Sequence, residues 1–477
     1  MNAPITRLFV VIVALFAVLV LFTSNWTVWG AKDLQDNPKN RRALLEEQRV
    51  HRGLIRAGDG TVLARSIKRS DGTYTRRYPQ HGLFAHAVGY SYTSLGRSGL
   101  EKSRNAELSG DKGELGSIID QISGRQREGD DVLTTLDPAA QRVALQQLNG
   151  RKGAVVALDP RTGAIKVMAS VPGYDPGTVP DPKVYKALTS PSNTNAPLLN
   201  RTTQSGYPPG STFKVVTAIA AIDSGRYTPS STVNGKSPQT ISGRPLSNFG
   251  NEQFGEIPLT TALTHSVNTV WAQVGEKLGK DTMRKYMERL GFDAQPPIDL
   301  PPDQVRASGE YLGGRLIKPT NPNVDVGRMA IGQDKLNATP LQMAMVASAV
   351  ADDGRLMEPH LTDRVVDRDG RTVKRIEPKQ FSRVMSASSA RQVNQMMQQV
   401  VKEGTGTAAA LAGIDVGGKT GTAEVDRSCG PNQLWFIGFA PANDPKVAVA
   451  ATVECGAGTG GTVAAPIAKA VMQELLK

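Results

Sequence analysis

Two groups of predicted strands lie on either side of a long helical region, and this separation constrains the fold most. The first group is GAVVALDPRTGAIKVMAS, in which two alternating apolar runs flank a turn at residues 159–163. The second group is KTGTAEV, LWFIGFA and KVAVAATVE, which follow one another closely near the C-terminus. Residues 175–417 between the groups carry mostly helical patterns. We therefore expect an α/β (α+β) domain with one antiparallel sheet of about five strands, split by a helical insert.

Two amphipathic patterns flank these strand groups. AAQRVALQQL follows Asp137 and Pro138, which suit the start of a helix, and Asn149 with Gly150 ends it. APIAKAVMQELL closes the chain with a second helical pattern. We expect these two helices to cover the sheet.

The N-terminal segment is apolar enough to cross a membrane. It follows Arg7, carries no charge, stays apolar from Leu8 to Phe22 and ends near two tryptophans, which suit a membrane interface. A cleaved signal peptide is the alternative, but the residues before Ala31 form a poor small-residue cleavage site. We predict a short cytoplasmic end and a single transmembrane anchor in residues 1–31, with the rest of the chain exported.

Composition divides the remainder into two domains. Residues 32–130 are polar and rich in Arg, Gly and Ser, which predicts a small β-rich module without catalytic motifs, whereas residues 131–477 hold the sheet and the helices. The formal net charge of +12 suits anionic surroundings. Aromatic residues make up only 5% of the chain, which disfavours stacking on nucleic-acid bases, so we expect no nucleic-acid partner.

Two glycine motifs imitate nucleotide-binding sites. Residues 413–420 match a phosphate loop, but such a loop joins a strand to a following helix, and the residues that follow Lys419 predict a strand. Gly456, Gly458 and Gly461 match a dinucleotide motif, which needs a second strand further along the chain. We therefore predict no nucleotide cofactor.

Three short motifs together predict acyl-transfer chemistry. Ser211 and Lys214 lie on one face of a predicted first helical turn, where a lysine with a lowered pKa can take the proton of a serine. An isolated pair of this kind is more often an N-cap serine beside a solvated lysine. Ser266, Asn268 and Lys419 complete the ordered set S-x-x-K, S-x-N and K-T-G, a signature of serine acyl transfer.

With this set the chain resembles the class B penicillin-binding proteins, and in length and composition it is most similar to their short actinobacterial form. Further similar segments cover nearly the whole chain: RGLIRAGDGTVLA, GRSGLEKSRNAELSG, GAIKVMASVPGYDP, AIGQDKLNATPLQMA and LWFIGFAP. The first of them departs from the family's common Asp-Arg-Asn-Gly turn at residues 56–60, in the non-catalytic dimerisation or pedestal module.

The resemblance implies a D,D-transpeptidase that crosslinks peptidoglycan. Ser211 would attack the carbonyl between the two terminal D-alanines of a stem peptide, and the amine of a neighbouring stem peptide would resolve the acyl-enzyme. Lys214 would act as the base, while Ser266 and Lys419 would relay a proton to the leaving amine. Asn268 would hold the substrate backbone, and β-lactams would acylate the same serine.

The resemblance also implies how the substrate is held. Thr420 and Thr422 would bind its terminal carboxylate, and the glycine between them, Gly421, allows close backbone approach. Backbone N–H groups of Ser211 and Thr422 would form the oxyanion hole. The reaction would need no metal and no other cofactor.

The substrate implied by the resemblance also fixes the predicted topology. Peptidoglycan lies outside the cytoplasmic membrane, so the N-terminus would be cytoplasmic and the catalytic domain extracytoplasmic, although the charges beside the anchor do not orient it. About 100 residues before the catalytic domain are too few for a glycosyltransferase domain. Glycan polymerisation would then come from a polytopic membrane polymerase of the shape or division type.

The two cysteines predict a disulfide. Cys429 and Cys455 would lie at the same end of the sheet if the C-terminal strands are antiparallel neighbours. Outside the cytoplasm such a pair is usually oxidised to a disulfide. Neither cysteine has the neighbours of a metal site, so we predict no metal.

Three alternatives compete with this interpretation. A β-lactamase or β-lactam sensor has the same fold, but the additional module and the lack of an obvious deacylating acid motif argue against it. A non-catalytic cell-wall scaffold would not need complete motifs. His265 beside Ser266 suggests a Ser-His hydrolase, but the sequence has no G-x-S-x-G motif, so we interpret His265 as a packing or hydrogen-bonding residue.

Overall fold

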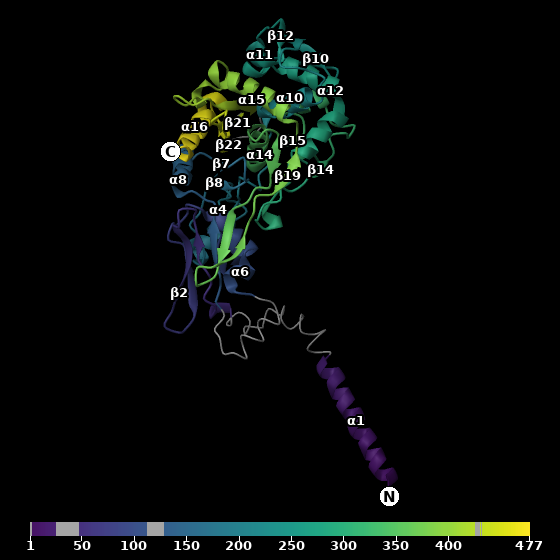
Figure 1. The fold of residues 1–477 in the computed structure, drawn as a ribbon, viewed down its shortest axis with the longest axis vertical. Helices are drawn as coiled ribbons and strands as arrows, with labels where there is room; N and C mark the ends of the chain where they lie inside the picture. The colour runs from purple at the N-terminus through teal and green to yellow at the C-terminus, as the bar shows by residue number, and fades with distance from the viewer. Residues whose placement is uncertain (1, 25–46, 112–127, 425–429, 431) are drawn as a thin grey trace. The chain divides into compact units, whose positions relative to one another are not determined.

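The structure is a computed structural model in which residues 2–24, 47–111, 128–424, 430 and 432–477 are described (Figure 1). The chain divides into two compact units, Met1–His51 with Ile67–Thr75 and Arg52–Ser66 with Arg76–Lys477. The two tryptophans predicted at the membrane interface lie outside the described residues, as does the predicted start of the N-terminal module.

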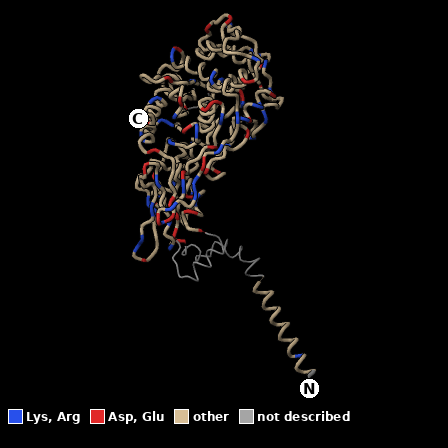
Figure 2. The backbone as a smooth tube through the Cα atoms, viewed as in Figure 1, with Lys and Arg blue, Asp and Glu red and all other residues tan. Residues whose placement is uncertain are grey.

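Helix α1, Asn2–Ser24, contains the predicted anchor. Its residues Ala3–Ser24 are long and apolar enough to cross a membrane. Figure 2 shows this helix almost free of charged residues, whereas blue and red segments are interspersed along the rest of the described chain. A signal sequence would have the same length and composition, so the helix supports membrane targeting and leaves its retention a prediction.

The predicted five-stranded antiparallel sheet is confirmed. Its strand order is β20-β21-β22-β7-β8, and every neighbouring pair is antiparallel. The pairing of β22 with β7 joins the two strand groups that are far apart in the sequence. The strands are β7 Gly153–Leu158, β8 Ile165–Val171, β20 Gly417–Glu424, β21 Asn432–Ala440 and β22 Val447–Gly456.

The two predicted covering helices pack on one face of this sheet. Helix α8, Pro138–Leu148, begins where Asp137 accepts a hydrogen bond from the Ala140 N–H at 2.9 Å and ends at Asn149. It packs against α16, Ala465–Leu475, which also contacts β21 and β22 (Figure 1). The N-cap of α8 is Asp137 and its C-cap is Asn149, so the helix begins and ends where the sequence predicted.

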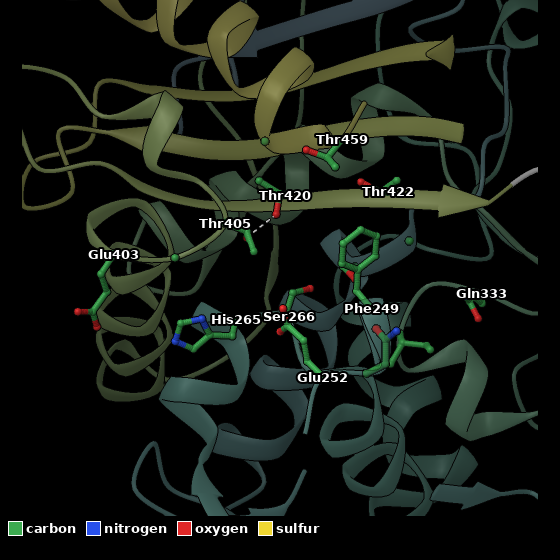
Figure 3. A pocket seen from close by; sticks show the side chains of 16 residues that line it. Phe249, Glu252, His265, Ser266, Gln333, Glu403, Thr405, Thr420, Thr422 and Thr459 are labelled. Carbon is green, nitrogen blue, oxygen red and sulfur yellow. Dashed lines mark hydrogen bonds between the residues drawn. The ribbon is translucent and has the colours of Figure 1, made fainter. Parts of the chain in front are cut away.

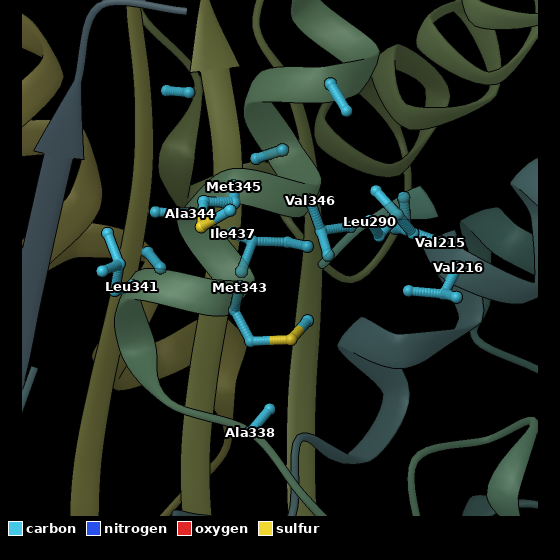
Figure 4. Packing of buried hydrophobic residues seen from close by; sticks show 14 of the residues in the cluster. Val215, Val216, Leu290, Ala338, Leu341, Met343, Ala344, Met345, Val346 and Ile437 are labelled. Carbon is cyan, nitrogen blue, oxygen red and sulfur yellow. The ribbon is translucent and has the colours of Figure 1, made fainter. Parts of the chain in front are cut away.

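The other face of the sheet is covered by α14, Pro340–Ala351, in which every residue is buried. Figure 4 shows Met343, Met345 and Val346 of this helix between Ile437 of β21 and the helix that follows Ser211. Alternate residues of the central strands enter the two cores, as strand geometry requires. The domain is therefore a helix–sheet–helix sandwich whose buried layer supports the segment that carries Ser211.

The insert between the strand groups is less helical than predicted. It also contains four small antiparallel sheets: β9 with β12, β10 with β11, β14-β13-β15, and β16 with β19. Each strand in them is two to four residues long, too short to show a two-residue alternation in the sequence. The strands are β9 Thr232–Asn234, β10 Gln239–Ile241, β11 Arg244–Leu246, β12 Glu256–Pro258, β13 Gly309–Leu312, β14 Arg315–Ile317, β15 Leu336–Asn337, β16 Arg355–Met357 and β19 Gln380–Arg383.

The α-helices of the insert are α9 Pro182–Thr189, α10 Lys214–Asp223, α11 Leu259–Thr264, α12 Asn268–Arg289, α13 Val326–Met329, α14 and α15 Ala387–Lys402. All of them except α9 contain buried residues. Helices α10 and α12 contact each other, and α15 contacts both α10 and β20. These contacts bring the first and second motifs to the edge of the sheet that carries the third.

The N-terminal module is β-rich, as predicted, but its sheet draws strands from far along the chain. The strand order is β18-β17-β6-β1-β2-β3, in which β6, β17 and β18 lie beyond residue 130. The strands are β1 Ile55–Arg56, β2 Val62–Lys68, β3 Tyr74–Arg77, β6 Asp131–Thr134, β17 Thr362–Val366 and β18 Thr372–Arg375, with β4 Ser91–Tyr92 and β5 Gly96–Arg97 paired separately. The short helices are α4 Ala85–Val88, α5 Gly99–Ser103 and α6 Asn105–Ser109.

The predicted disulfide has one cysteine outside the described residues, Cys429. Cys455 lies near the end of β22, and a Cβ on Gly430 would be 2.5 Å from its carbonyl oxygen, so the chain next to Cys429 passes close to Cys455. We expect the exported protein to gain the mass of two hydrogens on reduction. Intact-mass analysis that finds two free thiols before reduction would contradict the predicted bond.

Candidate active site

Ser211 lies in a single 3-10 turn, η3 Gly210–Phe213, which leads directly into α10. The predicted helix therefore begins one turn later than expected, with Lys214 as its first α-helical residue. The Ser211 side chain is partly exposed and lines a pocket, whereas Lys214 is wholly buried.

The turn before Ser211 is held on both sides. The Gly210 N–H donates to the Gly332 carbonyl at 3.0 Å, and Gly210 has a left-handed φ of 52° close against Ala423 of β20. The Trp435 indole donates to the Pro208 carbonyl at 2.9 Å from β21. Ser211 is therefore held in place by the sheet rather than by its own short helix.

Lys214 connects the first motif to the second. Its ammonium nitrogen donates to the Ser266 carbonyl at 2.6 Å, to Asn268 Oδ1 at 2.6 Å and to Ser266 Oγ at 3.2 Å. Burial, and secondly the positive charge of Lys419, hold the pKa of Lys214 well below its usual range. None of its three hydrogen-bond partners is a carboxylate, so the folded protein favours the neutral amine that a base requires.

The second motif occupies the tight junction between α11 and α12. Ser266 has a left-handed φ of 58°, a sparsely populated conformation for a residue with a side chain. Asn268 begins α12 and donates from Nδ2 to the Ser247 carbonyl at 3.1 Å. This hydrogen bond from Nδ2 and the hydrogen bond that Lys214 donates to Oδ1 hold both polar atoms of the Asn268 side chain.

The third motif lies on β20, at the edge of the sheet. Lys419 is wholly buried, its Nζ donates to the Thr420 carbonyl at 3.0 Å, and burial lowers its pKa to about 7. The Thr420 hydroxyl forms a hydrogen bond of 2.6 Å with the Thr405 hydroxyl. Thr422 Oγ1 accepts a hydrogen bond of 3.1 Å from the Gly460 N–H. The two threonines thus lie in the same strand as a buried lysine.

Close packing explains several glycines in and beside the two stretches that imitate nucleotide motifs. A Cβ on Gly417 or Gly418 would lie within 2.5 Å of an aromatic ring of β21. A Cβ on Gly460 would lie 2.2 Å from a carbonyl oxygen of β21, and one on Gly421 would lie 2.8 Å from the Pro209 carbonyl. These contacts leave no space for larger residues. Residues 417–420 of the phosphate-loop match lie in β20, which continues beyond Lys419 as the sequence predicted.

A pocket of about 390 Å³ brings the three motifs together (Figure 3). Ser211, Ser266, Asn268, Thr420 and Thr422 line it, and Figure 3 shows Ser266 across the pocket from the two threonines. The two lysines are buried beside these lining residues, and Gly421 lies in the strand between the two threonines. The other lining residues are Gly210, Phe249, Glu252, His265, Ile331, Gln333, Glu403, Gly404, Thr405, Thr459 and Gly461.

Most of these other lining residues belong to no sequence motif that would have predicted a role in the pocket. Thr405 lies in the glycine-rich stretch EGTGT and Thr459 in AGTGGT, but only the folded chain brings both stretches beside β20. His265 is exposed and stacks on the Phe254 ring with 6.0 Å between ring centroids, in line with the predicted packing role. Small polar residues in glycine-rich loops are therefore the part of the pocket that sequence patterns missed.

Lys419 predicts a pH dependence of stability. Its folded pKa is about 7 and its ordinary value is 10.5, so between these values the unfolded chain holds a proton that the folded chain lacks. The unfolding free energy of the wild type should therefore rise with pH across this window, relative to that of a Lys419→Met variant. Urea unfolding of both proteins at several pH values measures the difference, and a difference that falls or stays constant would contradict the prediction.

Two domain families match this chain. The penicillin-binding protein transpeptidase domain matches residues 153–473, and the penicillin-binding protein A dimerisation domain matches residues 52–132. The chain belongs to the penicillin-binding protein transpeptidase family. The family resemblance drawn from the motifs is therefore confirmed, and the module before the catalytic domain is similar to a dimerisation domain.

Curated relatives cover this transpeptidase from end to end. It is 35% identical to the peptidoglycan D,D-transpeptidase PbpA of Mycolicibacterium smegmatis over 503 residues, which span 100% of this chain and 99% of the relative. It is 34% identical to PbpA of Mycobacterium tuberculosis over 500 residues, with the same coverage of both chains.

Solved structures share the fold. The ceftriaxone acyl-enzyme complex of penicillin-binding protein A from M. tuberculosis matches with a TM-score of 0.82 and 32% identity, over 91% of this chain and 100% of that one. A D,D-transpeptidase domain from Eggerthella lenta matches with a TM-score of 0.78 and 35% identity, over 90% of this chain and 98% of that one. Both likenesses support the sheet and insert described above.

Proposed function

We propose that this protein is a peptidoglycan D,D-transpeptidase that works through an acyl-enzyme on Ser211. The observation that carries the proposal is the hydrogen bonding of buried Lys214 to both residues of the second motif, beside the pocket that Ser211 lines. Curated relatives that match this chain over almost their full length carry this activity in their names.

Acylation begins when Lys214 takes the hydroxyl proton of Ser211. The serine oxygen then attacks the carbonyl between the two terminal D-alanines, and the C–N bond of the leaving D-alanine breaks. Ser266 Oγ lies 3.2 Å from Lys214 Nζ, so a proton can pass through this hydroxyl to the leaving amine. Lys214 can serve as the base because burial favours its neutral form.

The donor peptide is held by charge and by the edge strand. Its terminal carboxylate binds the hydroxyls of Thr420 and Thr422 beside the Lys419 ammonium, while Asn268 holds its backbone. Backbone N–H groups of Ser211 and Thr422 form the oxyanion hole, each worth about 3 to 4 kcal/mol of the barrier. The edge position of β20 leaves one side of the strand available to an extended peptide.

An amine of a second stem peptide then attacks the ester and releases Ser211. β-Lactams acylate the same serine because they imitate the D-alanyl-D-alanine end. Penicillin-binding protein A of M. tuberculosis forms acyl-enzymes with ceftriaxone, imipenem and penicillin G. The same drugs are therefore suitable probes of this protein.

We infer that the reaction takes place at the outer side of the cytoplasmic membrane. The N-terminus is cytoplasmic, and the domain that carries Ser211 is extracytoplasmic. The glycan strands come from a polytopic membrane polymerase of the shape or division type, which contacts the anchor and the module. α1, which is long and apolar enough to cross a membrane, supports this arrangement.

A fluorescent penicillin tests the proposed activity. The purified protein is labelled, excess drug is removed, and the retained label is followed over time. A transpeptidase holds the label for a long time, a β-lactamase loses it within seconds, and a scaffold never acquires it. Release of D-alanine from a peptide that ends in D-alanyl-D-alanine, faster with an added amine than without, supports transfer over hydrolysis.

A further inference from the structure

We propose that Glu252 and Glu403 recognise the acceptor of the transfer reaction as a primary ammonium group. This inference rests on the proposed function, because it assigns the second substrate of the same pocket. The acceptor would be a peptide whose aliphatic primary amine enters the pocket as a cation, rather than a molecule that enters it uncharged or as an anion.

The charges that line the pocket differ from those of the whole chain. The chain has 56 Lys and Arg residues and a formal charge of +12, yet among the described residues that line this pocket none is Lys or Arg. Glu252 and Glu403 are its two charged lining residues, and both are exposed. Within the described chain neither carboxylate takes part in an ion pair, so both are available to a cation in the pocket.

The two carboxylates lie on the side of the pocket that the donor does not need. Figure 3 shows Glu252 and Glu403 away from the strand that carries Thr420 and Thr422, with Ser266 on their side of the pocket. A donor carboxylate is attracted to the threonines beside buried Lys419 and repelled by the glutamates. An ammonium has the opposite preference. The pocket therefore separates its two substrates by charge.

Local structure does not explain Glu403. It is the C-cap residue of the 16-residue helix α15, where the negative end of the helix dipole disfavours a carboxylate. It is followed by Gly404, where a Cβ would lie 2.3 Å from the Thr264 carbonyl, so the chain runs close to α11 on its way to Thr405. Because a carboxylate at this helix end destabilises the helix, we infer that Glu403 serves to bind a ligand rather than to stabilise α15.

Glu252 is positioned by a buried amide. Asn248 is 5% exposed, and its Nδ2 donates to the Glu252 carbonyl at 3.0 Å while its Oδ1 accepts from the Thr269 N–H at 3.0 Å. Thr269 follows Asn268 of the second motif. The backbone of Glu252 is thus tied to the helix that carries this motif.

The transfer step balances with these residues as binding groups only. The acceptor enters as R–NH3⁺ beside the glutamates and loses one proton to solvent. Its nitrogen then forms the new C–N bond, the ester bond between the acyl carbon and Ser211 Oγ breaks, and the second proton returns to Ser211 Oγ. The first proton is lost more easily once the amine leaves the glutamates and approaches the ester, because the carboxylates no longer stabilise its positive charge.

The test compares two acceptors on one acyl-enzyme. The full-length wild type, Glu252→Gln, Glu403→Gln and the double variant are supplied with a thioester donor. Each receives either Nα-acetyl-lysine amide, a cation at neutral pH, or hydroxylamine, which is uncharged there. Glu377→Gln is the matched control, because Glu377 is exposed and does not line the pocket. The ratio of transfer to hydrolysis is measured at low and at high salt.

We expect the double variant to lose about tenfold in transfer to the lysine amide at low salt, and less at high salt, because salt screens exposed charges. Transfer to hydroxylamine and acylation by penicillin should stay as in the wild type and in Glu377→Gln. Equal losses with both acceptors, or no loss with the lysine amide, would overturn the proposal. A wild type that no penicillin acylates would instead contradict the proposed function.

Discussion

A Ser211→Ala variant is expected to form no covalent adduct with any β-lactam and to release D-alanine about 10⁶-fold more slowly than the wild type, the scale of loss when a serine nucleophile is removed. The side chain is partly exposed and ends in the pocket, so its loss leaves the core intact. The measurement is fluorescent-penicillin labelling together with D-alanine release, at equal protein concentrations. An unchanged thermal unfolding midpoint shows that the variant is folded.

The matched control is Ser224→Ala, at the C-cap of α10, where the hydroxyl donates a hydrogen bond only to the Ala221 carbonyl among described residues. This variant should label like the wild type. A Ser211→Ala protein that still acquires a stable label would move the nucleophile elsewhere, with Ser266 as the next hydroxyl in the pocket.

A Lys214→Met variant is expected to slow acylation of Ser211 by about 10²- to 10⁴-fold, the range for loss of a general base. Methionine keeps the length of the side chain but cannot take a proton. The change removes the donor to Ser266 and Asn268, which costs about 1 to 3 kcal/mol for acceptors left without partners, but it also removes the cost of burying a polar amine. The net effect on the unfolding free energy should therefore be small.

The second-order rate constant of penicillin acylation, measured across pH, checks this role. The pKa of Lys214 is held well below its usual range, so the wild-type rate should rise with pH as the lysine loses its proton. The Lys214→Met rate should be flat over the same window. Lys277→Met, an exposed change on α12, serves as the control. A variant that keeps the wild-type rate would exclude Lys214 as the base.

The sequence predicted the catalytic sheet well because its strands are long and its connections are short. The alternating runs on either side of residues 159–163 and the last three strands show clear periodicity, and antiparallel pairing follows from their short connections. The N-terminal sheet was harder, because β1 pairs in parallel with β6, and β6 pairs with β17 more than 200 residues later. No local pattern encodes such a pairing.

The site could be predicted only in part, for a similar reason. Ser211, Lys214, Ser266 and Lys419 belong to short motifs whose residue types and order indicate chemistry. Thr405 has no such motif, and only tertiary structure brings its hydroxyl within 2.6 Å of Thr420. The burial of both lysines, which lowers their pKa values, likewise depends on packing between the sheet and the insert.

Peptide mapping by mass spectrometry after penicillin treatment tests the central claim most directly. The wild-type protein is treated with penicillin G, digested, and searched for the covalent adduct. We predict one penicilloyl group per protein, on the peptide that contains Ser211, with fragment ions that place it on that hydroxyl. An adduct on Ser266, or a protein that carries none after prolonged treatment, would contradict an acyl-enzyme on Ser211.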